Sequence, residues 1–237
     1  MKIKLVRKIM ADNNARARRN RGLFADSRVL CVNVLSGPGA GKTAILEKTI
    51  PALREQFALH SAVIEGDVEG DLDGARLDAL GVPVVQLNTS GACHLDATMI
   101  ASALEELDLA GTQVLFIENV GNLVCPAGFD LGEDLRAVVL SIPEGDDKPI
   151  KYPAMFKKAT VLLINKCDLA PHLDFSIDRV HRACKRLNPE LVTFELSART
   201  GEGVAEWVAF LAEKYRLKAE QDRRTGAGAG GNKEQSR

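Results

Sequence analysis

Short aliphatic runs alternate with longer amphipathic stretches through most of the chain. The runs predict strands at residues 29–35, 62–65, 84–87, 114–118, 137–142, 161–165 and 191–196. The stretches between them predict helices at residues 43–56, 72–80, 95–107, 177–187 and 204–217. This alternation is typical of βαβ units, whose strands form a mainly parallel sheet covered by helices on both faces. We therefore predict one doubly wound α/β domain over residues 28–217.

Two flanking segments differ from this pattern. Residues 1–27 form a basic, helix-prone arm with little apolar periodicity, which predicts a solvated helix that packs loosely or contacts a partner. A mitochondrial transit peptide and a nucleic-acid-binding arm are the alternatives. Residues 218–237 are polar and rich in glycine. Because they bury too little apolar surface to offset the entropy of ordering, they are predicted to be a disordered tail.

The composition narrows the class of protein. Of the 237 residues, 46% are hydrophobic and 27% are charged, which is ordinary for a soluble globular protein. The net charge of -1 and the 5% aromatic content argue against nucleic acid or an anionic membrane as a partner. No apolar run approaches the roughly 20 residues that span a bilayer, and the chain start lacks a secretory signal, so a cytoplasmic protein is expected.

The five cysteines show no disulfide framework, and in a reducing compartment they are expected to be thiols. Cys31, Cys167 and Cys184 lie within apolar or helical patterns and are interpreted as small buried hydrophobic residues. Cys93 and Cys125 instead fall in loops, close to other candidate ligands.

Residues 36–43, SGPGAGKT, follow an apolar strand and open a helix, which is the context of a phosphate-binding loop. Its small residues let backbone N–H groups curl around the β- and γ-phosphates at a helix N-terminus. Lys42 supplies a point charge to these phosphates, and the Thr43 hydroxyl is a Mg²⁺ ligand. Ser36 replaces the first glycine of the usual pattern. The predicted nucleotide contacts are Gly37, Gly39, Ala40, Gly41, Lys42, Thr43 and Ala44.

A second loop predicts which base is bound. Asn165, Lys166 and Asp168 follow a strand, at the sheet edge where open α/β folds bind ligands. The aspartate can accept hydrogen bonds from guanine N1–H and N2–H₂, a donor pair that adenine lacks. Asn165 ties this loop to the phosphate loop, and the Lys166 stem covers the base. Ser197, Ala198 and Arg199 follow the last strand, where backbone N–H groups meet the guanine carbonyl. The sequence therefore predicts GTP and GDP over ATP.

Carboxylates at the γ-phosphate are needed to hold Mg²⁺. Asp67 follows the second predicted strand, and Glu118 ends the strand at 114–118, so both lie at the same edge as Thr43. Either is suited to bind Mg²⁺, directly or through water, or to orient the attacking water. Gly121 is placed to approach the γ-phosphate with its N–H. Asp73 is either a further ligand or the cap of the helix that follows.

Cys93 and His94 precede a helix, and Cys125 follows the segment 118–122. Two thiolates and an imidazole suit Ni²⁺ or Zn²⁺. Because three ligands leave a tetrahedral site incomplete, two chains sharing one site is a natural completion. The short loop from Glu118 to Cys125 would couple metal geometry to the nucleotide state. In the alternative interpretation both thiols are simply packed.

Several segments together resemble the HypB family of hydrogenase nickel-incorporation GTPases, which belongs to the SIMIBI class of dimerising P-loop NTPases. The resemblance covers roughly residues 29–217. It is carried by GPGAGKT at 37–43, IEGD at 64–67, CHLDA at 93–97, ENVGNLVCPAGFDLGE at 118–133, DDKPIKYPAMF at 146–156 and NKCDL at 165–169.

The resemblance implies a GTP-promoted homodimer with Cys93, His94 and Cys125 as a nickel or zinc site at its interface. It implies GTP hydrolysis that drives nickel transfer to the NiFe-hydrogenase large-subunit precursor, with HypA as partner. It also implies that Lys148 or Lys151 reaches the nucleotide of the opposite subunit. The arm at residues 1–27 has neither cysteine nor histidine, so the nickel storage of many members is not expected.

Two other functions remain as alternatives. The urease-associated relative UreG has a Cys-Pro-His metal loop and a Glu-Ser-Gly-Gly segment, whereas this chain has CH at 93–94 and ENVG at 118–121. A GTP-switched interaction module without a metal role would keep the nucleotide site and leave the thiols without function.

Overall fold

The computed structural model describes residues 2–67, 72–89 and 91–229, with side chains from residue 8 to residue 223. Its elements in chain order are α1 (Lys2–Asp26), β1 (Leu30–Ser36), α2 (Lys42–Phe57), β2 (Ser61–Asp67), α3 (Leu72–Asp78), β3 (Val84–Asn88), α4 (Ala97–Glu106), β4 (Val114–Glu118), η1 (Cys125–Gly128), β5 (Leu135–Ser141), η2 (Ile142–Glu144), α5 (Lys148–Lys151), α6 (Pro153–Lys158), β6 (Val161–Asn165), η3 (Cys167–His172), α7 (Ile177–Leu187), β7 (Val192–Glu195) and α8 (Val204–Ala229).

The strands form one seven-stranded sheet in the order β3-β2-β4-β1-β5-β6-β7, and every neighbouring pair is parallel. The predicted doubly wound α/β fold is confirmed. Glu118 at the end of β4 lies in register with Val34 of β1 and with Glu65 of β2. The carboxyl ends of β1, β2 and β4 therefore meet at one edge, where α/β sheets bind ligands.

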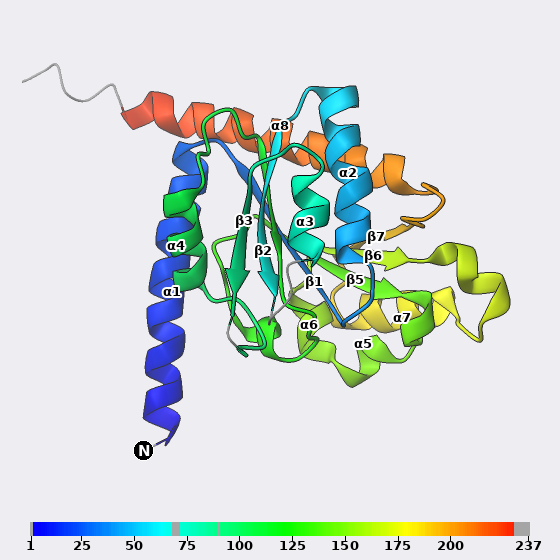
Figure 1. Cartoon of the computed structure of the whole chain (residues 1–237). Coiled ribbons are helices and arrows are strands. Elements are labelled where there is room, and N and C mark those ends of the chain that lie inside the picture. The colour runs from blue at the N-terminus through cyan, green and yellow to red at the C-terminus, as the bar shows by residue number, and fades with distance from the viewer. Residues whose placement is uncertain (1, 68–71, 90, 230–237) are drawn as a thin grey trace, which may run out of the picture.

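Helices cover both faces of the sheet (Figure 1). One face packs against α2, α3 and α8, with Phe116 and Trp207 among its fully buried side chains. On the other face, α1 and α4 cover the β2–β4 half around Phe24, whereas α6 and α7 cover the β5–β6 half around Phe156. The strands are therefore enclosed by apolar side chains, which matches their continuous aliphatic runs.

Helix α1 packs more closely than predicted. It runs beside α4 (Figure 1), and Ala17 and Phe24 are fully buried. Asn13 Oδ1 accepts from the Ala97 backbone N–H at 3.0 Å, and Asn20 Nδ2 donates to the Ala97 carbonyl at 2.9 Å. The expectation of loose packing is wrong for residues 13–24 of the arm. Buried asparagines anchor this part of the helix, although its apolar periodicity is weak.

The last helix also extends beyond its predicted end. Helix α8 continues to Ala229; Lys218 Nζ pairs with Asp134 Oδ2 at 2.6 Å, and Ala219 is buried. The predicted start of a disordered tail at residue 218 is therefore wrong, since an ion pair and a buried alanine hold this turn to the domain. The rest of that predicted tail, residues 230–237, lies outside the described residues, as does Ser90. None of the described helices is long and apolar enough to cross a membrane.

Candidate nucleotide and metal sites

The phosphate-loop sequence forms the turn between β1 and α2. Gly41 has φ 97°, and a Cβ on it would lie 2.5 Å from Asn165 Nδ2, so glycine is required there both by conformation and by space. Ser36, which replaces the first glycine of the usual pattern, is the last residue of β1. Its buried hydroxyl donates to the Gly37 carbonyl at 2.5 Å. The serine is therefore compatible with the loop.

A buried carboxylate lies beside the start of α2. Glu118 Oε1 accepts from Thr43 Oγ1 at 2.8 Å and lies 3.8 Å from Lys42 Nζ. Glu118 Oε2 is buried, and no hydrogen-bond partner for it exists within the described part of the chain. Burial raises the pKa of Glu118, and Lys42 and Thr43 partly oppose this shift. A hydroxyl and an unsatisfied carboxylate oxygen are the hard oxygen ligands that Mg²⁺ prefers, so these residues fit a Mg²⁺ site.

A second buried acid, Glu65, was missed in the sequence. It lies in register with Glu118 on the neighbouring strand, and its Oε2 has no partner among the described residues. Desolvation, followed by the charges of Glu118 and Asp67, raises the pKa of Glu65 to about 8. The signal in the sequence was a glutamate inside an otherwise apolar strand, because such a residue is buried and rarely unpaired without a role.

The remaining residues predicted around the γ-phosphate occupy different positions. Asp67 ends β2 and is partly buried, on the same face of the strand as Glu65. Gly121 packs on the phosphate loop, where a Cβ would lie 2.9 Å from Pro38 Cα. Asp73 lies inside the first turn of α3, which begins at Leu72, and pairs with Arg76 at 2.9 Å. It is therefore a first-turn residue of the helix and not its cap.

The predicted base-recognition loop lies against the phosphate loop. Asn165 Nδ2 donates to the Ala40 carbonyl at 2.8 Å, and Lys166 Nζ donates to the Gly39 carbonyl at 2.7 Å. Between the two loops lies a pocket of about 430 Å³. The residues lining it are Gly41, Ala44, Asn165, Lys166, Asp168, Leu169, Ala198 and Arg199. The structure thus brings together residues that are far apart in the sequence.

Asp168 is held by its neighbours. Its Oδ1 accepts from Ser197 Oγ at 2.5 Å, and its Oδ2 pairs with Arg199 at 2.8 Å. The Ser197 hydrogen bond and the Arg199 charge lower the pKa of Asp168, which favours an ionised acceptor. The Ser197 N–H already donates to the Glu202 carbonyl, and the Ala198 N–H donates to Asn165 Oδ1. In this arrangement, neither the Ser197 nor the Ala198 N–H is free for the predicted contact with a guanine carbonyl.

Cys93, His94 and Cys125 come together in space. Their ligand atoms lie within 4.8 Å of one another, and Cys93 Sγ is 3.7 Å from His94 Nδ1. The His94 ring lies against Phe129, with centroids 4.0 Å apart. Burial lowers the pKa of His94, which favours the neutral imidazole that binds metals. A hydrogen bond with Cys125 raises the pKa of Cys93. Two thiols and one imidazole at this spacing suit a borderline-soft ion.

Two asparagines shape the loops that carry these ligands, and both were missed as functional residues. Asn122 Oδ1 accepts from the Val124 and Cys125 backbone N–H groups at 2.7 and 3.2 Å. Asn119, which is almost fully buried, accepts from the Leu95 N–H at 3.1 Å and donates to Asn33 Oδ1 at 3.3 Å. The only signal was two asparagines in a short loop between Glu118 and Cys125.

The two lysines predicted to act across a dimer differ in position. Lys148 lines a cavity of about 450 Å³ together with Gly37, Pro38 and Gly121. Lys151 is largely exposed, and its Nζ pairs with Asp147 at 2.5 Å. The structure therefore places Lys148 beside the phosphate loop of its own chain and does not bring Lys151 there.

Comparison with known proteins gives concordant matches. The sequence profile of the family described as CobW/HypB/UreG, nucleotide-binding domain, matches residues 31–195. The hydrogenase maturation factor HypB of Azotobacter chroococcum mcd 1 is 46% identical over 222 residues, which cover 93% of this chain and 72% of that protein. HypB of Escherichia coli (strain K12) is 47% identical over 203 residues, which cover 86% of this chain and 69% of that protein. The crystal structure of HypB from Helicobacter pylori in complex with nickel superposes with a TM-score of 0.83 at 36% identity, covering 88% of this chain and 97% of that one.

Proposed function

This chain belongs to the CobW/HypB/UreG nucleotide-binding family, with HypB maturation factors as its relatives, and we propose that it couples GTP binding and hydrolysis to nickel delivery during NiFe-hydrogenase maturation. The observation that carries the proposal is the short path between two sites. One short loop, residues 119–124, joins Glu118, beside the phosphate loop, to Cys125, in the cluster of Cys93, His94 and Cys125 (the thiol cluster). The relatives are HypB proteins, so the urease-type alternative is not favoured.

The nucleotide half of the proposal rests on the phosphate loop and the base pocket. Lys42 supplies positive charge to the phosphates, and the Gly121 N–H approaches the γ-phosphate. Thr43, Asp67 and Glu118 would hold Mg²⁺, which when bound supplies further positive charge. Asp67 or Glu118 orients the attacking water. The ionised Asp168 supports guanine over adenine as the base.

The cargo half rests on Cys93, His94 and Cys125. These residues suit Ni²⁺, with Zn²⁺ as the other candidate ion. One chain supplies only three of the four ligands of a tetrahedral ion. We therefore propose a homodimer, favoured by GTP, in which two copies share the ion. In delivery, a HypA-type nickel protein and the hydrogenase large-subunit precursor are the proposed partners. The nickel in the related Helicobacter pylori structure is consistent with this cargo.

Asn119 supplies a physical route between the two halves. It directly follows Glu118, and its side chain holds the backbone N–H of Leu95, which directly follows His94. The Leu95 side chain also packs on Gly66, where a Cβ would lie 2.7 Å from its nearest atom. A shift of Glu118 or of Asp67 on β2 is therefore transmitted to the ligand loop through a packed contact and a buried hydrogen bond.

Nickel titration in two nucleotide states tests this proposal. The affinity with a non-hydrolysable GTP analogue should differ from that with GDP by about fivefold or more, a common size for allosteric coupling. Cys93→Ser and Cys125→Ser should each weaken binding, whereas Cys167→Ser, a partly buried thiol outside the cluster, should not. Equal binding in both states, unaffected by the two cluster variants, would favour an interaction module without a metal role. The same titration with zinc identifies the preferred ion.

A further inference from the structure

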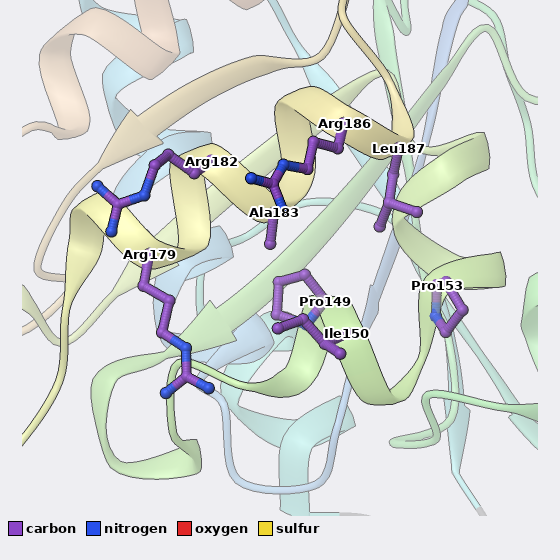
Figure 2. Close-up of a pocket in the computed structure, with 8 residues that line it drawn as sticks. All are labelled: Pro149, Ile150, Pro153, Arg179, Arg182, Ala183, Arg186 and Leu187. Atoms are coloured by element: carbon purple, nitrogen blue, oxygen red, sulfur yellow. The ribbon is translucent and has the colours of Figure 1, made fainter.

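A pocket of about 400 Å³ lies between α5, the start of α6 and α7, away from both candidate sites (Figure 2). Its lining has two chemical parts. The apolar part consists of Pro149, Ile150, Pro153, Ala183 and Leu187. The basic part consists of Arg179, Arg182 and Arg186, which extend from α7. The pocket can therefore take an apolar group while offering guanidinium groups beside it.

Most of this positive charge is not neutralised. Arg179 pairs with Asp146 at 3.0 Å, but neither Arg182 nor Arg186 has an ion-pair partner within the described part of the chain. Residues 146–158 and 177–187, which form this face, carry eight lysines and arginines against three aspartates. The whole chain has a net charge of -1, so this positive face is a local feature. Such a concentration of charge attracts a negatively charged partner.

The apolar part is accessible as well. Ile150 is 60% exposed, whereas the neighbouring Pro149 is buried and supports it. Both arginines without an ion pair are also exposed. An exposed aliphatic side chain at the mouth of an apolar pocket, beside arginines, is the composition of a recognition surface.

We propose that this pocket docks an acidic segment of a partner protein, with one aliphatic side chain of that segment in the pocket and its carboxylates on Arg182 and Arg186. Bidentate pairing with carboxylates is the interaction for which guanidinium groups are suited. Nucleic acid fits less well, because no aromatic side chain lines the pocket for base stacking. A membrane fits less well, because the apolar residues line a concavity instead of protruding from an amphipathic face.

The docking surface is separate from the nucleotide and metal residues. Helix α5 lies between the two regions: Lys148 lines the cavity beside Gly37 and Gly121, whereas Pro149 and Ile150 line this pocket. The inference therefore does not rest on the proposed GTPase and nickel chemistry, and it survives if that chemistry is disproved.

Fluorescence anisotropy with two labelled nine-residue peptides tests the proposal on the full chain. One peptide carries four aspartates on each side of a central leucine, and the other has serine in place of that leucine. The leucine peptide should bind more tightly by about tenfold or more, as expected for one buried aliphatic side chain. The double variant Arg182→Glu/Arg186→Glu should weaken binding of the leucine peptide by tenfold or more, because it removes charged hydrogen bonds to the peptide carboxylates.

Two further variants separate pocket binding from general charge attraction. Lys185→Glu reverses one charge on the same helix, outside the pocket, and its counterpart in the pocket is Arg182→Glu alone. Lys185→Glu should change binding by less than about twofold. Ala183→Trp fills the pocket and should abolish the preference for the leucine peptide while leaving the charges intact. Thermal unfolding of each variant confirms that it is folded.

Three results would overturn the proposal. The first is equal affinity for the leucine and serine peptides in the wild-type chain. The second is a loss with Lys185→Glu as large as that with the double variant. The third is displacement of the leucine peptide by single-stranded DNA, or by vesicles containing phosphatidylserine, that is equally effective with Lys185→Glu and with the double variant. Each would show a diffuse electrostatic surface in place of a peptide pocket.

Discussion

The side-chain oxygen of Asn119 accepts a hydrogen bond from the backbone N–H of Leu95 at 3.1 Å, and both residues are buried. Asn119 is next to Glu118 in the sequence, and Leu95 is next to His94. One buried hydrogen bond therefore joins the residue after Glu118, a candidate Mg²⁺ ligand, to the residue after the candidate metal ligands Cys93 and His94. Buried hydrogen bonds of this kind are costly to break without a replacement partner.

Asn119→Ala should weaken the coupling between the nucleotide and metal sites. The Leu95 N–H loses its acceptor, and the unsatisfied group costs about 1–3 kcal/mol. We expect the ratio of nickel affinities in the GTP-analogue and GDP states to fall toward one, and the Leu95 amide to exchange hydrogen faster. Isothermal titration and hydrogen-exchange mass spectrometry measure the two effects. An unchanged affinity ratio together with faster exchange would mean that the bond is structural only.

The phosphate-site residues should separate binding from turnover. Lys42→Ala should abolish nucleotide binding, because it removes the point charge at the phosphates. Glu118→Gln and Asp67→Asn should lower turnover by about a hundredfold with GTP binding largely kept, as for other groups that stabilise a transition state. Equilibrium binding of a fluorescent nucleotide and phosphate-release assays measure these effects. Normal turnover in both carboxylate variants would remove them as metal or water ligands.

Asp168→Asn should weaken guanine recognition. The variant replaces one of two charged acceptor oxygens by an NH₂ donor, at a cost of about 1.5–3 kcal/mol, or roughly 10- to 100-fold in affinity. Arg199→Ala is the matched control, because it removes the exposed partner of Asp168 and leaves the carboxylate in place. Competition between GTP, ATP and xanthosine triphosphate measures the change. ATP competing as well as GTP against the wild-type chain would contradict guanine specificity.

The buried Glu65 should make stability depend on pH. Its pKa is raised from 4.5 to about 8 in the folded chain, so between these values the folded state keeps a proton that the unfolded state has lost. Stability should therefore fall as the pH rises through this window and then level off above it. Glu65→Gln should remove the part of this dependence that Glu65 contributes and stabilise the chain at pH 9 by an amount on the order of a few kcal/mol. Urea unfolding from pH 5 to pH 9 in EDTA, for both chains, measures the difference. Parallel curves for the two chains would contradict the prediction.

Helix α1 should be held by its asparagines. Asn20→Ala removes the donor to the Ala97 and Leu131 carbonyls, and it should destabilise the chain by about 1–3 kcal/mol. Asn14→Ala, on the exposed side of the same helix, should change stability by less than about 0.5 kcal/mol. Chemical unfolding of the two variants measures the comparison. Equal stabilities would mean that the helix contributes little to the fold.

The parts of the site that could be predicted from the sequence are those whose chemistry requires a fixed local spacing. Gly41, Lys42 and Thr43 belong to one turn, and Asn165 and Asp168 belong to another, so short motifs place them. Their mutual approach also follows from sequence, because the carboxyl ends of parallel strands share one edge.

The features missed in the sequence depend on tertiary contacts. Asn20 and Asn119 anchor a helix and a loop through buried side-chain hydrogen bonds, and hydrophobic periodicity carries no signal for such contacts. Glu65 becomes a site residue only because β2 and β4 pair in a register that sets it beside Glu118. Helix α8 continues beyond its apolar pattern because Lys218 pairs with Asp134, which lies 84 positions away in the sequence.

The most direct test of nucleotide control over a shared metal site is the mass and nickel content of the chain, measured together by light scattering and metal analysis after gel filtration. With a non-hydrolysable GTP analogue and nickel, we expect a species of twice the chain mass with about one nickel ion per dimer at the shared site. With GDP, we expect a smaller dimer fraction and less retained nickel. A monomer in every nucleotide state, with nickel retention that does not depend on the nucleotide or on Cys93 and Cys125, would contradict it.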